Sequence, residues 1–502
     1  MKKRGKAMTT ACKRFAWTGA LLAGAAATTN AQAPGDSKAI SASKVERKNK
    51  APVSKEILKV KLPKAVEATL PNGMTVLILE DHRFPLVHVD FTIDGAGALW
   101  EPKDQPGLAA ATAQMLREGT PGKTSKQIGE EIERLGARFS ASAPYGDGAT
   151  SVDASGLSDN MDTWFPLVTE LMLDASFPSE ELAKLKQRLK VQLVQQRQLP
   201  SFLASERFSE AVYGSHPAAV VATTPEAIDA LTSEKLAAWR KARYAPQNTI
   251  LGISGDVTPA TVLAKLRLWM ARWEKTDFKV QPTPATTEVK EKRVYVVDRP
   301  NSVQTTLAMG NIAIDRTSPD YPAMVVMNQI LGAGPAARLF LNLREAKGYT
   351  YGVYSRFTAR KYAGPFRAGG DARTEVTEGT MTEFWKEFNR IRDEQVSAEE
   401  LDDARHSVVA GFALSLEDAD QLLGFSVDRK YYGLPDDYWE KYPAQIAGIS
   451  AADVQRVAKK YVDPATMQVV AVGDAKKIVP VLEKYGTVQA TDAQGKPLGG
   501  MK

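Results

Sequence analysis

The sequence predicts an α+β fold built from two copies of one domain of about 200 residues. Both strand-like and helix-like patterns occur in the first half, because apolar and polar residues alternate over 87–94 and apolar residues recur at helical spacing further along. The two halves of the chain also close with the same ordered set of elements. A duplicated mixed domain explains both observations, and 502 residues are enough for two such domains.

The first half is expected to begin with two strands. The turn dipeptide Asn72-Gly73 precedes a strand over 74–80. The next strand, 87–94, carries its apolar residues on one face and its polar residues on the other, so one face should be buried. Apolar residues at helical spacing then predict four helices, at about 108–118, 124–136, 158–175 and 179–198.

The closing segments of the two halves match each other in order. Ser233 is expected to cap a helix that reaches Tyr244, and Ser450 to cap one that reaches Tyr461; in both cases the tyrosine follows the serine by eleven positions. Each helix is followed by a proline, an apolar strand and a Gly-Asp pair. This repeated order predicts that the second half adopts the fold of the first.

The net charge of +6 is unevenly distributed along the chain. Residues 1–33 hold six basic and no acidic residues, residues 34–64 hold nine basic and three acidic residues, and the remainder is therefore acidic, at −6. A basic surface for nucleic acid is excluded for this remainder. The expected organisation is a signal peptide (1–33), a flexible basic leader (34–64), two domains (65–276 and 292–486), a linker between them (277–291) and a C-terminal tail (487–502).

The first 33 residues have the pattern of a cleaved secretory signal. A basic stretch ends at Arg14, an apolar run covers 15–27, and small residues precede Ala31 and Ala33, either of which can be the cleavage position. The apolar run is shorter than the ~20 residues that span a bilayer. The single cysteine, Cys12, lies within this signal, so the mature chain would hold no thiol, which suits an oxidising compartment. We therefore expect export to a periplasm.

The first half also contains five short motifs: Leu70-Pro-Asn-Gly-Met-Thr-Val76, Gly95 to Glu101, Gly107-Leu108-Ala109, Met115-Leu116 and Gly119-Thr120. Together they resemble the N-terminal domain of the pitrilysin/insulinase zinc peptidases. In that family the helix after Gly-Leu-Ala carries His-x-x-Glu-His, whose histidines bind zinc and whose glutamate activates the metal-bound water. The corresponding residues here are Ala110, Ala113 and Gln114, so the resemblance implies that the motif is lost.

Nothing elsewhere in the sequence replaces the lost zinc ligands. The third ligand of the family, a glutamate on a later helix, corresponds to Val191 or Gln192, and no acidic residue occurs from 182 to 205. No two of the histidines lie three to five residues apart, so they offer no ligand pair on a helix; they are His82, His88, His216 and His406. No metal or other cofactor is expected in this chain, and zinc would belong to a partner subunit.

The second half contains Arg338-Leu-Phe-Leu-Asn-Leu-Arg344-Glu-Ala-Lys-Gly348-Tyr-Thr-Tyr351. This segment resembles the C-terminal domain signature of the same family, in which an arginine and a tyrosine seven residues apart hold the substrate opposite the zinc. Arg344 and Tyr351 have this spacing. The resemblance covers roughly 65–486 and implies, for each half, a mostly antiparallel sheet packed with helices, and, for the two together, a clam-like chamber.

The resemblance implies the non-zinc subunit of a heterodimeric periplasmic metallopeptidase. In such a pair Arg344 and Tyr351 would complete the active site of a zinc-bearing homologous subunit that hydrolyses peptides, and this chain alone would be inactive. An alternative is a non-catalytic peptide-binding or assembly protein, similar to the structural core subunits of respiratory complexes. An independent hydrolase has no supporting motif, because the phosphate-loop-like Gly119–Thr124 lacks its first glycine and Gly252–Gly255 lacks the spacing of a nucleophile elbow.

Overall fold

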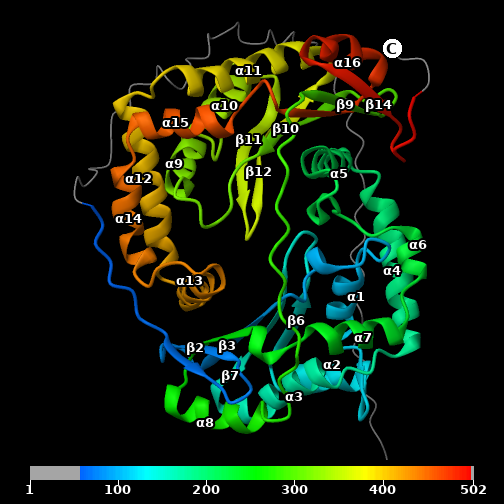
Figure 1. Cartoon of the computed structure of the whole chain (residues 1–502), viewed down its shortest axis with the longest axis vertical. Helices are drawn as coiled ribbons and strands as arrows, with labels where there is room; N and C mark the ends of the chain where they lie inside the picture. The colour runs from blue at the N-terminus through cyan, green and yellow to red at the C-terminus, as the bar shows by residue number, and fades with distance from the viewer. Residues whose placement is uncertain (1–56, 499–502) are drawn as a thin grey trace, which may run out of the picture. The chain divides into compact units, whose positions relative to one another are not determined.

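The computed structural model describes residues 57–498 (Figure 1). The expected signal peptide and residues 34–56 of the expected leader lie outside the described residues. Among residues 57–498, no helix combines the length and apolar character needed to cross a membrane.

The first half forms a six-stranded sheet in the order β1-β2-β8-β3-β7-β6. All neighbouring strands are antiparallel except β2 and β8, which are parallel. The predicted alternation of the second strand is confirmed, because Val87, Val89, Phe91 and Ile93 have no exposed surface. The strands are β1 (Val66–Thr69), β2 (Thr75–Glu80), β3 (Leu86–Asp94), β6 (Arg138–Ser142), β7 (Ala149–Leu157) and β8 (Thr249–Gly255), with a separate hairpin of β4 (Gly119–Thr120) and β5 (Lys123–Thr124).

Eight helices accompany this sheet in the described part of the first half, and the four predicted ones lie where the apolar spacing placed them. The first predicted helix ends early, at Met115, and the third begins at Met161, after a 3₁₀ turn at Ser158–Asn160. The helices are α1 (Leu108–Met115), α2 (Ser125–Arg134), α3 (Met161–Leu173), α4 (Ser179–Gln196), α5 (Pro200–Tyr213), α6 (Pro225–Asp229), α7 (Ser233–Arg243) and α8 (Pro259–Trp269).

The second half forms a six-stranded sheet in the order β11-β12-β10-β13-β9-β14. Its strands are β9 (Arg293–Asp298), β10 (Gln304–Ile312), β11 (Thr350–Ala359), β12 (Ala363–Arg373), β13 (Gln468–Gly473) and β14 (Thr487–Thr491). Its helical segments are α9 (Tyr321–Leu331), α10 (Arg338–Phe340), a π-helix (Leu341–Ala346), α11 (Thr377–Asp393), α12 (Ala398–Ser415), α13 (Ala419–Tyr432), α14 (Tyr438–Gly448), α15 (Ala451–Tyr461) and α16 (Ala475–Leu482).

The sheet orders confirm the predicted duplication. Strands β2-β8-β3-β7-β6 of the first sheet correspond in order and direction to β9-β13-β10-β12-β11 of the second, because the first pair is parallel and the later pairs are antiparallel in both. The sixth strands differ. Strand β1 precedes β2 and is antiparallel to it, whereas β14 comes late in the chain and is parallel to β9.

One detail of the predicted repeat is wrong. Thr232, not Ser233, caps α7, because the Thr232 hydroxyl accepts a hydrogen bond from the backbone N–H of Lys235, while the Ser233 hydroxyl donates to the carbonyl of Phe177 at 2.6 Å. In the second half, Ser450 does cap α15 and forms a capping box with Asp453. Two adjacent hydroxyl residues compete for the cap in the first half, and the tertiary contact to Phe177 decides between them.

Each half places one helix on the sheet of the other. Helix α5 buries Leu203 and Phe208 in a cluster that contains Val297 and Val470 of the second sheet. Helix α13 buries Leu423, together with Val427, against Leu77 and Leu79 of β2. This exchange adds apolar contacts between the halves that are independent of the segment joining them.

Candidate functional site

Helix α1 carries the residues that correspond to the lost zinc motif. Ala110 and Gln114 lie one helical turn apart and both line a small cavity of about 110 Å³. Ala113 does not line this cavity and instead is buried in the core of the first half, with 1 % of its surface exposed. Ala110 and Gln114, which are four residues apart, therefore lie on one face of the helix, while Ala113 packs into the core.

The start of α1 is fixed by the Glu101 carboxylate and by the conformation of Gly107. The Glu101 carboxylate accepts the backbone N–H groups of Gly107 and Ala109, at 2.8 and 2.6 Å, and so caps the helix. Burial nevertheless raises the pKa of Glu101, to about 7. Gly107 has φ +96°, and a Cβ at this residue would lie 2.9 Å from the Tyr145 hydroxyl, so a side chain there is excluded by both conformation and space.

The structure distinguishes the two residues of α4 that the sequence left open for the third ligand. Gln192 lines the same cavity as Ala110 and Gln114, whereas Val191 is not part of it and is 55 % exposed. The sequence could not distinguish Val191 from Gln192, because it does not show which side of α4 faces α1. The structure therefore brings Ala110, Gln114 and Gln192 together.

The cavity at α1 and α4 does not fit a zinc ion. Its polar lining consists of glutamine amides and the hydroxyls of Tyr145 and Thr223, and no imidazole, carboxylate or thiolate lines it. These neutral groups are not the ligands that zinc requires. Within residues 57–498, no group of three or more His, Cys, Asp or Glu residues is arranged to hold a metal ion.

Arg344 and Tyr351 are brought together in the second half. Arg344 lies in the π-helix, and Tyr351 is the second residue of the edge strand β11. The guanidinium carbon of Arg344 lies 4.7 Å from the ring centroid of Phe340 and 5.0 Å from that of Tyr351. The Tyr351 side chain makes no hydrogen bond within the described residues, and the residue is 86 % exposed. Tyr351 therefore presents its phenol to solvent, while Arg344 is half-buried, with Nε 3.6 Å from Glu345 Oε1.

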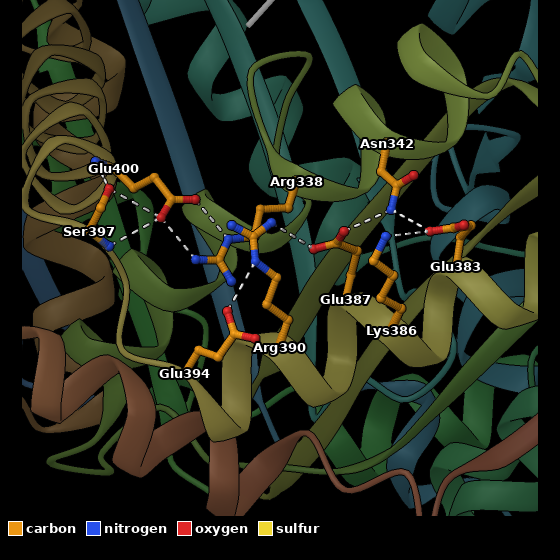
Figure 2. A network of polar contacts seen from close by, with 9 residues as sticks. All are labelled: Arg338, Asn342, Glu383, Lys386, Glu387, Arg390, Glu394, Ser397 and Glu400. Carbon is orange, nitrogen blue, oxygen red and sulfur yellow. Dashed lines mark hydrogen bonds and ion pairs between the residues drawn. The ribbon is translucent and has the colours of Figure 1, made fainter.

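The segment that carries Arg344 is tied to helices α11 and α12 by a polar network (Figure 2). At its start, Arg338 donates from Nε and Nη2 to the two carboxylate oxygens of Glu400, at 2.8 and 2.9 Å. Four residues later, the Asn342 amide donates to Glu383 at 2.9 Å and to Glu387 at 2.7 Å. Both contacts lie on the N-terminal side of Arg344, and they join it to helices that are distant in sequence.

Two carboxylates of this network are held in their ionised form. Burial raises the pKa of Glu400, but the hydrogen bonds and charge of Arg338 outweigh burial, and the net pKa is lowered. Burial likewise raises the pKa of Glu383, and the hydrogen bonds from Asn342, Lys347 and Lys386 lower it further than burial raises it. Sequence reasoning missed these residues. The spacing of Glu383 and Glu387 marks one helix face, but no sequence signal says which segment that face meets.

The four histidines do not come together. His82 lies between two carboxylates, with Nε2 2.7 Å from Glu80 and Nδ1 2.6 Å from Asp256. His88 is on the polar face of β3, and His216 accepts the backbone N–H of Ala218 at its Nδ1. Both carboxylates at His82 raise its pKa.

A larger cavity, of about 1160 Å³, lies over the polar face of the first sheet. Its lining includes three exposed apolar side chains, Phe84, Leu86 and Leu414, which are 67 %, 52 % and 70 % exposed. Asp153 also lines it and is the cross-strand partner of Asp90. Burial, together with the charge of Asp153, raises the pKa of Asp90 to about 6. This cavity combines an apolar rim with a polar floor.

The fold agrees with comparisons to known proteins. The insulinase family (peptidase family M16) matches residues 75–224, and the peptidase M16 inactive domain matches residues 230–408. The chain belongs to the M16 insulinase family. Its two sheets are the two halves of that family's fold.

Relatives match over most of their length. The chain is 25 % identical over 404 residues to an uncharacterized zinc protease of Rickettsia bellii, covering 78 % of this chain and 93 % of the relative. It is 23 % identical over 409 residues to the non-peptidase homolog YmxG of Helicobacter pylori, covering 80 % and 92 %. A crystal structure of a peptidase M16 inactive domain from Pseudomonas fluorescens superposes with a TM-score of 0.76 at 28 % identity, covering 82 % of this chain and 98 % of that one.

Proposed function

We propose that this chain is the non-zinc subunit of a heterodimeric periplasmic M16 peptidase. In this proposal the chain contributes Arg344 and Tyr351 to an active site whose zinc is bound by a homologous partner. One observation carries the proposal: the cavity at Ala110, Gln114 and Gln192 has no metal ligand, while Arg344 and Tyr351 lie together, with the phenol exposed and the turn of Arg344 anchored. The similarity to proteins described as an inactive domain and as a non-peptidase homolog supports an inactive chain in isolation.

The chemistry of the pair suits peptide hydrolysis. The guanidinium of Arg344 can donate charge-assisted hydrogen bonds to a peptide carbonyl and so hold the scissile bond in place. The Tyr351 hydroxyl is free to donate to the oxyanion that develops on that carbonyl. The partner's metal supplies the activated water.

The test is reconstitution with a partner. The natural candidate is the product of a neighbouring reading frame that carries an intact His-x-x-Glu-His motif. We expect hydrolysis of a quenched fluorescent peptide by the mixture and by neither chain alone, with zinc found only in the partner. A partner in which the motif glutamate is changed to glutamine controls for contaminating peptidases. Formation of the complex without a gain in activity over the partner alone would overturn the proposal.

A non-catalytic peptide-binding function is the second candidate, and the 1160 Å³ cavity favours it. Phe84, Leu86 and Leu414 expose apolar surface at its lining, which is a feature of surfaces that bind other molecules. This function predicts that the isolated chain binds peptides with an affinity that falls in Phe84→Ser and Leu414→Ser but not in Tyr351→Phe. The heterodimeric peptidase predicts instead that turnover by the pair falls in Tyr351→Phe and not in Phe84→Ser or Leu414→Ser.

A further inference from the structure

We infer that Asn342 is a positioning residue for Arg344, because its side-chain amide fixes the π-helical turn that stacks Arg344 on Tyr351. The importance of this stacking for catalysis rests on the proposed function. The geometric claim can be tested on this chain alone.

The turn that carries Arg344 has an unusual hydrogen-bond pattern. The backbone N–H of Lys347 donates to the carbonyl of Asn342 at 3.0 Å, which is the i to i−5 bond of a π-helix. Such turns are rare compared with α-helical turns and occur frequently at functional sites. A continuous α-helix would shift the hydrogen-bond register by one residue and rotate Arg344 about the helix axis. Contacts from outside the turn are therefore needed to favour the π form.

Asn342 and Lys347 supply such contacts on both sides of Arg344. The Asn342 amide donates to Glu383 Oε2 at 2.9 Å, and Lys347 Nζ lies 3.2 Å from Glu383 Oε1. One carboxylate of α11 thus holds the residue two before Arg344 and the residue three after it. The second amide hydrogen of Asn342 goes to Glu387, so that both of its donors are used.

An asparagine is chemically matched to this place. Glu387 is 3 % exposed and Glu383 is 9 % exposed, so each carboxylate needs a donor from the protein. The amide provides two donors and no charge, and it bridges carboxylates that lie one turn apart on α11. Without it, the one partner that Glu387 retains among residues 57–498 is Arg390, whose Nη1 lies 3.6 Å from Oε2. An apolar residue at 342 would therefore leave a buried carboxylate poorly paired and release the turn.

The stacking can be measured directly by fluorine NMR on the whole chain without a partner, with 3-fluorotyrosine incorporated at residue 351. Arg344→Ala provides the reference for loss of stacking. We expect Asn342→Leu to move the fluorine signal in the same direction as Arg344→Ala, and Asn342→Gln to restore part of the wild-type shift. If the leucine variant does not fold, Asn342→Ser, whose side chain is smaller and keeps one donor, replaces it in the same measurement.

Asn311→Leu is the matched control. Asn311 is a buried asparagine of the second half whose amide, like that of the half-buried Asn342, makes two hydrogen bonds, to the carbonyls of Ile312 and Tyr461, at 2.8 and 3.0 Å. Its loss should lower the melting temperature and leave the fluorine signal unchanged. A folded Asn342 variant with the wild-type fluorine signal would overturn the inference, as would an equal shift in the Asn311 variant.

Activity of the reconstituted pair gives an independent measurement. Asn342→Leu is expected to lower kcat/KM by about 10- to 100-fold. The double variant with Arg344→Ala should be no worse than Arg344→Ala alone, because the two changes remove one function. Additive losses would contradict a positioning role. If the wild-type pair is inactive, the proposed function fails, and the fluorine measurement still decides the role of Asn342.

Discussion

The guanidinium carbon of Arg344 lies 5.0 Å from the ring centroid of Tyr351, although the two residues belong to different elements, a π-helical turn and an edge strand. At this distance a cation is attracted to the face of an aromatic ring. The contact therefore holds the half-buried Arg344 and the exposed Tyr351 in one arrangement before any substrate binds, which reduces the entropy lost on binding. The predictions below test what this pair and its supporting residues contribute.

Tyr351→Phe should preserve the complex with a zinc-bearing partner and lower its turnover. The phenol would be lost as a donor to the oxyanion, and loss of one such donor typically costs ~10²–10³-fold in kcat. The measurement is steady-state hydrolysis of a quenched fluorescent peptide, with complex formation followed by gel filtration. Tyr354→Phe, a nearby tyrosine of β11 that is 48 % exposed, is the control. Equal turnover of wild type and Tyr351→Phe would show that the hydroxyl has no catalytic role.

Arg344→Ala should lower turnover to a comparable degree and raise KM, because a carbonyl clamp acts on bound substrate as well as on the transition state. Arg344→Lys should rescue poorly, since a planar set of donors is replaced by a single ammonium group. Both variants need the same kinetic and gel-filtration measurements. A lysine variant with wild-type kinetics would indicate that only the positive charge matters.

Zinc binding should be restored only by rebuilding all three ligands. The variant Ala110→His, Ala113→Glu, Gln114→His is expected to remain without stoichiometric zinc, because no carboxylate faces it from α4. Ala110→His, Gln114→His and Gln192→Glu together should bind zinc, because these three residues line one cavity. The same histidines with Val191→Glu form the control and should not. Metal analysis after dialysis decides, and zinc bound equally by both carboxylate variants would refute the assigned register of α4.

Arg338→Leu should destabilise the fold strongly. Arg338 is 6 % exposed and forms two hydrogen bonds with Glu400, so its removal leaves a carboxylate without its main partner. Because the Glu400 side chain is one-third exposed, loss of these two charge-assisted hydrogen bonds should cost about 2 kcal/mol of unfolding free energy. Arg373→Leu is the control, because its pair with Glu375 is largely exposed and should contribute less than about 1 kcal/mol. Urea unfolding measures both, and equal stabilities would contradict the anchoring role.

The pH dependence of stability should change in Asp90→Asn. Burial and the neighbouring Asp153 raise the pKa of Asp90 to about 6, so folding favours its protonated form. The stability linked to this proton is complete below pH 3.8, the ordinary pKa of the group, and is lost as the pH rises through about 6. Asparagine cannot ionise, so the variant should gain stability relative to wild type between pH 4 and 7. The measurement is the melting temperature across this pH range. Asp104→Asn, at an exposed residue, is the control, and its melting temperature should change with pH as that of the wild type does.

Much of the fold could be predicted because it depends on local patterns. The alternation in β3 and the repeated closing segments of the two halves are visible in the sequence, and the sheets confirm both. The competition between Thr232 and Ser233 for a helix cap could not be settled, because the partner of Ser233 is a carbonyl 56 residues away. The exchange of α5 and α13 between the sheets was also missed, since an apolar helix face does not indicate which surface it covers.

For the site, the available chemical groups can be read from the residues alone. The sequence shows that α1 offers no imidazole or carboxylate at residues 110, 113 and 114, and that an arginine and a tyrosine stand seven residues apart, because residue types and spacing are properties of the chain. The tertiary structure alone decided that Gln192 rather than Val191 faces α1, and that Glu383 and Glu387 hold the turn around Arg344. Those contacts join helices far apart in sequence, and their register is set by packing against the cores, which no local pattern encodes.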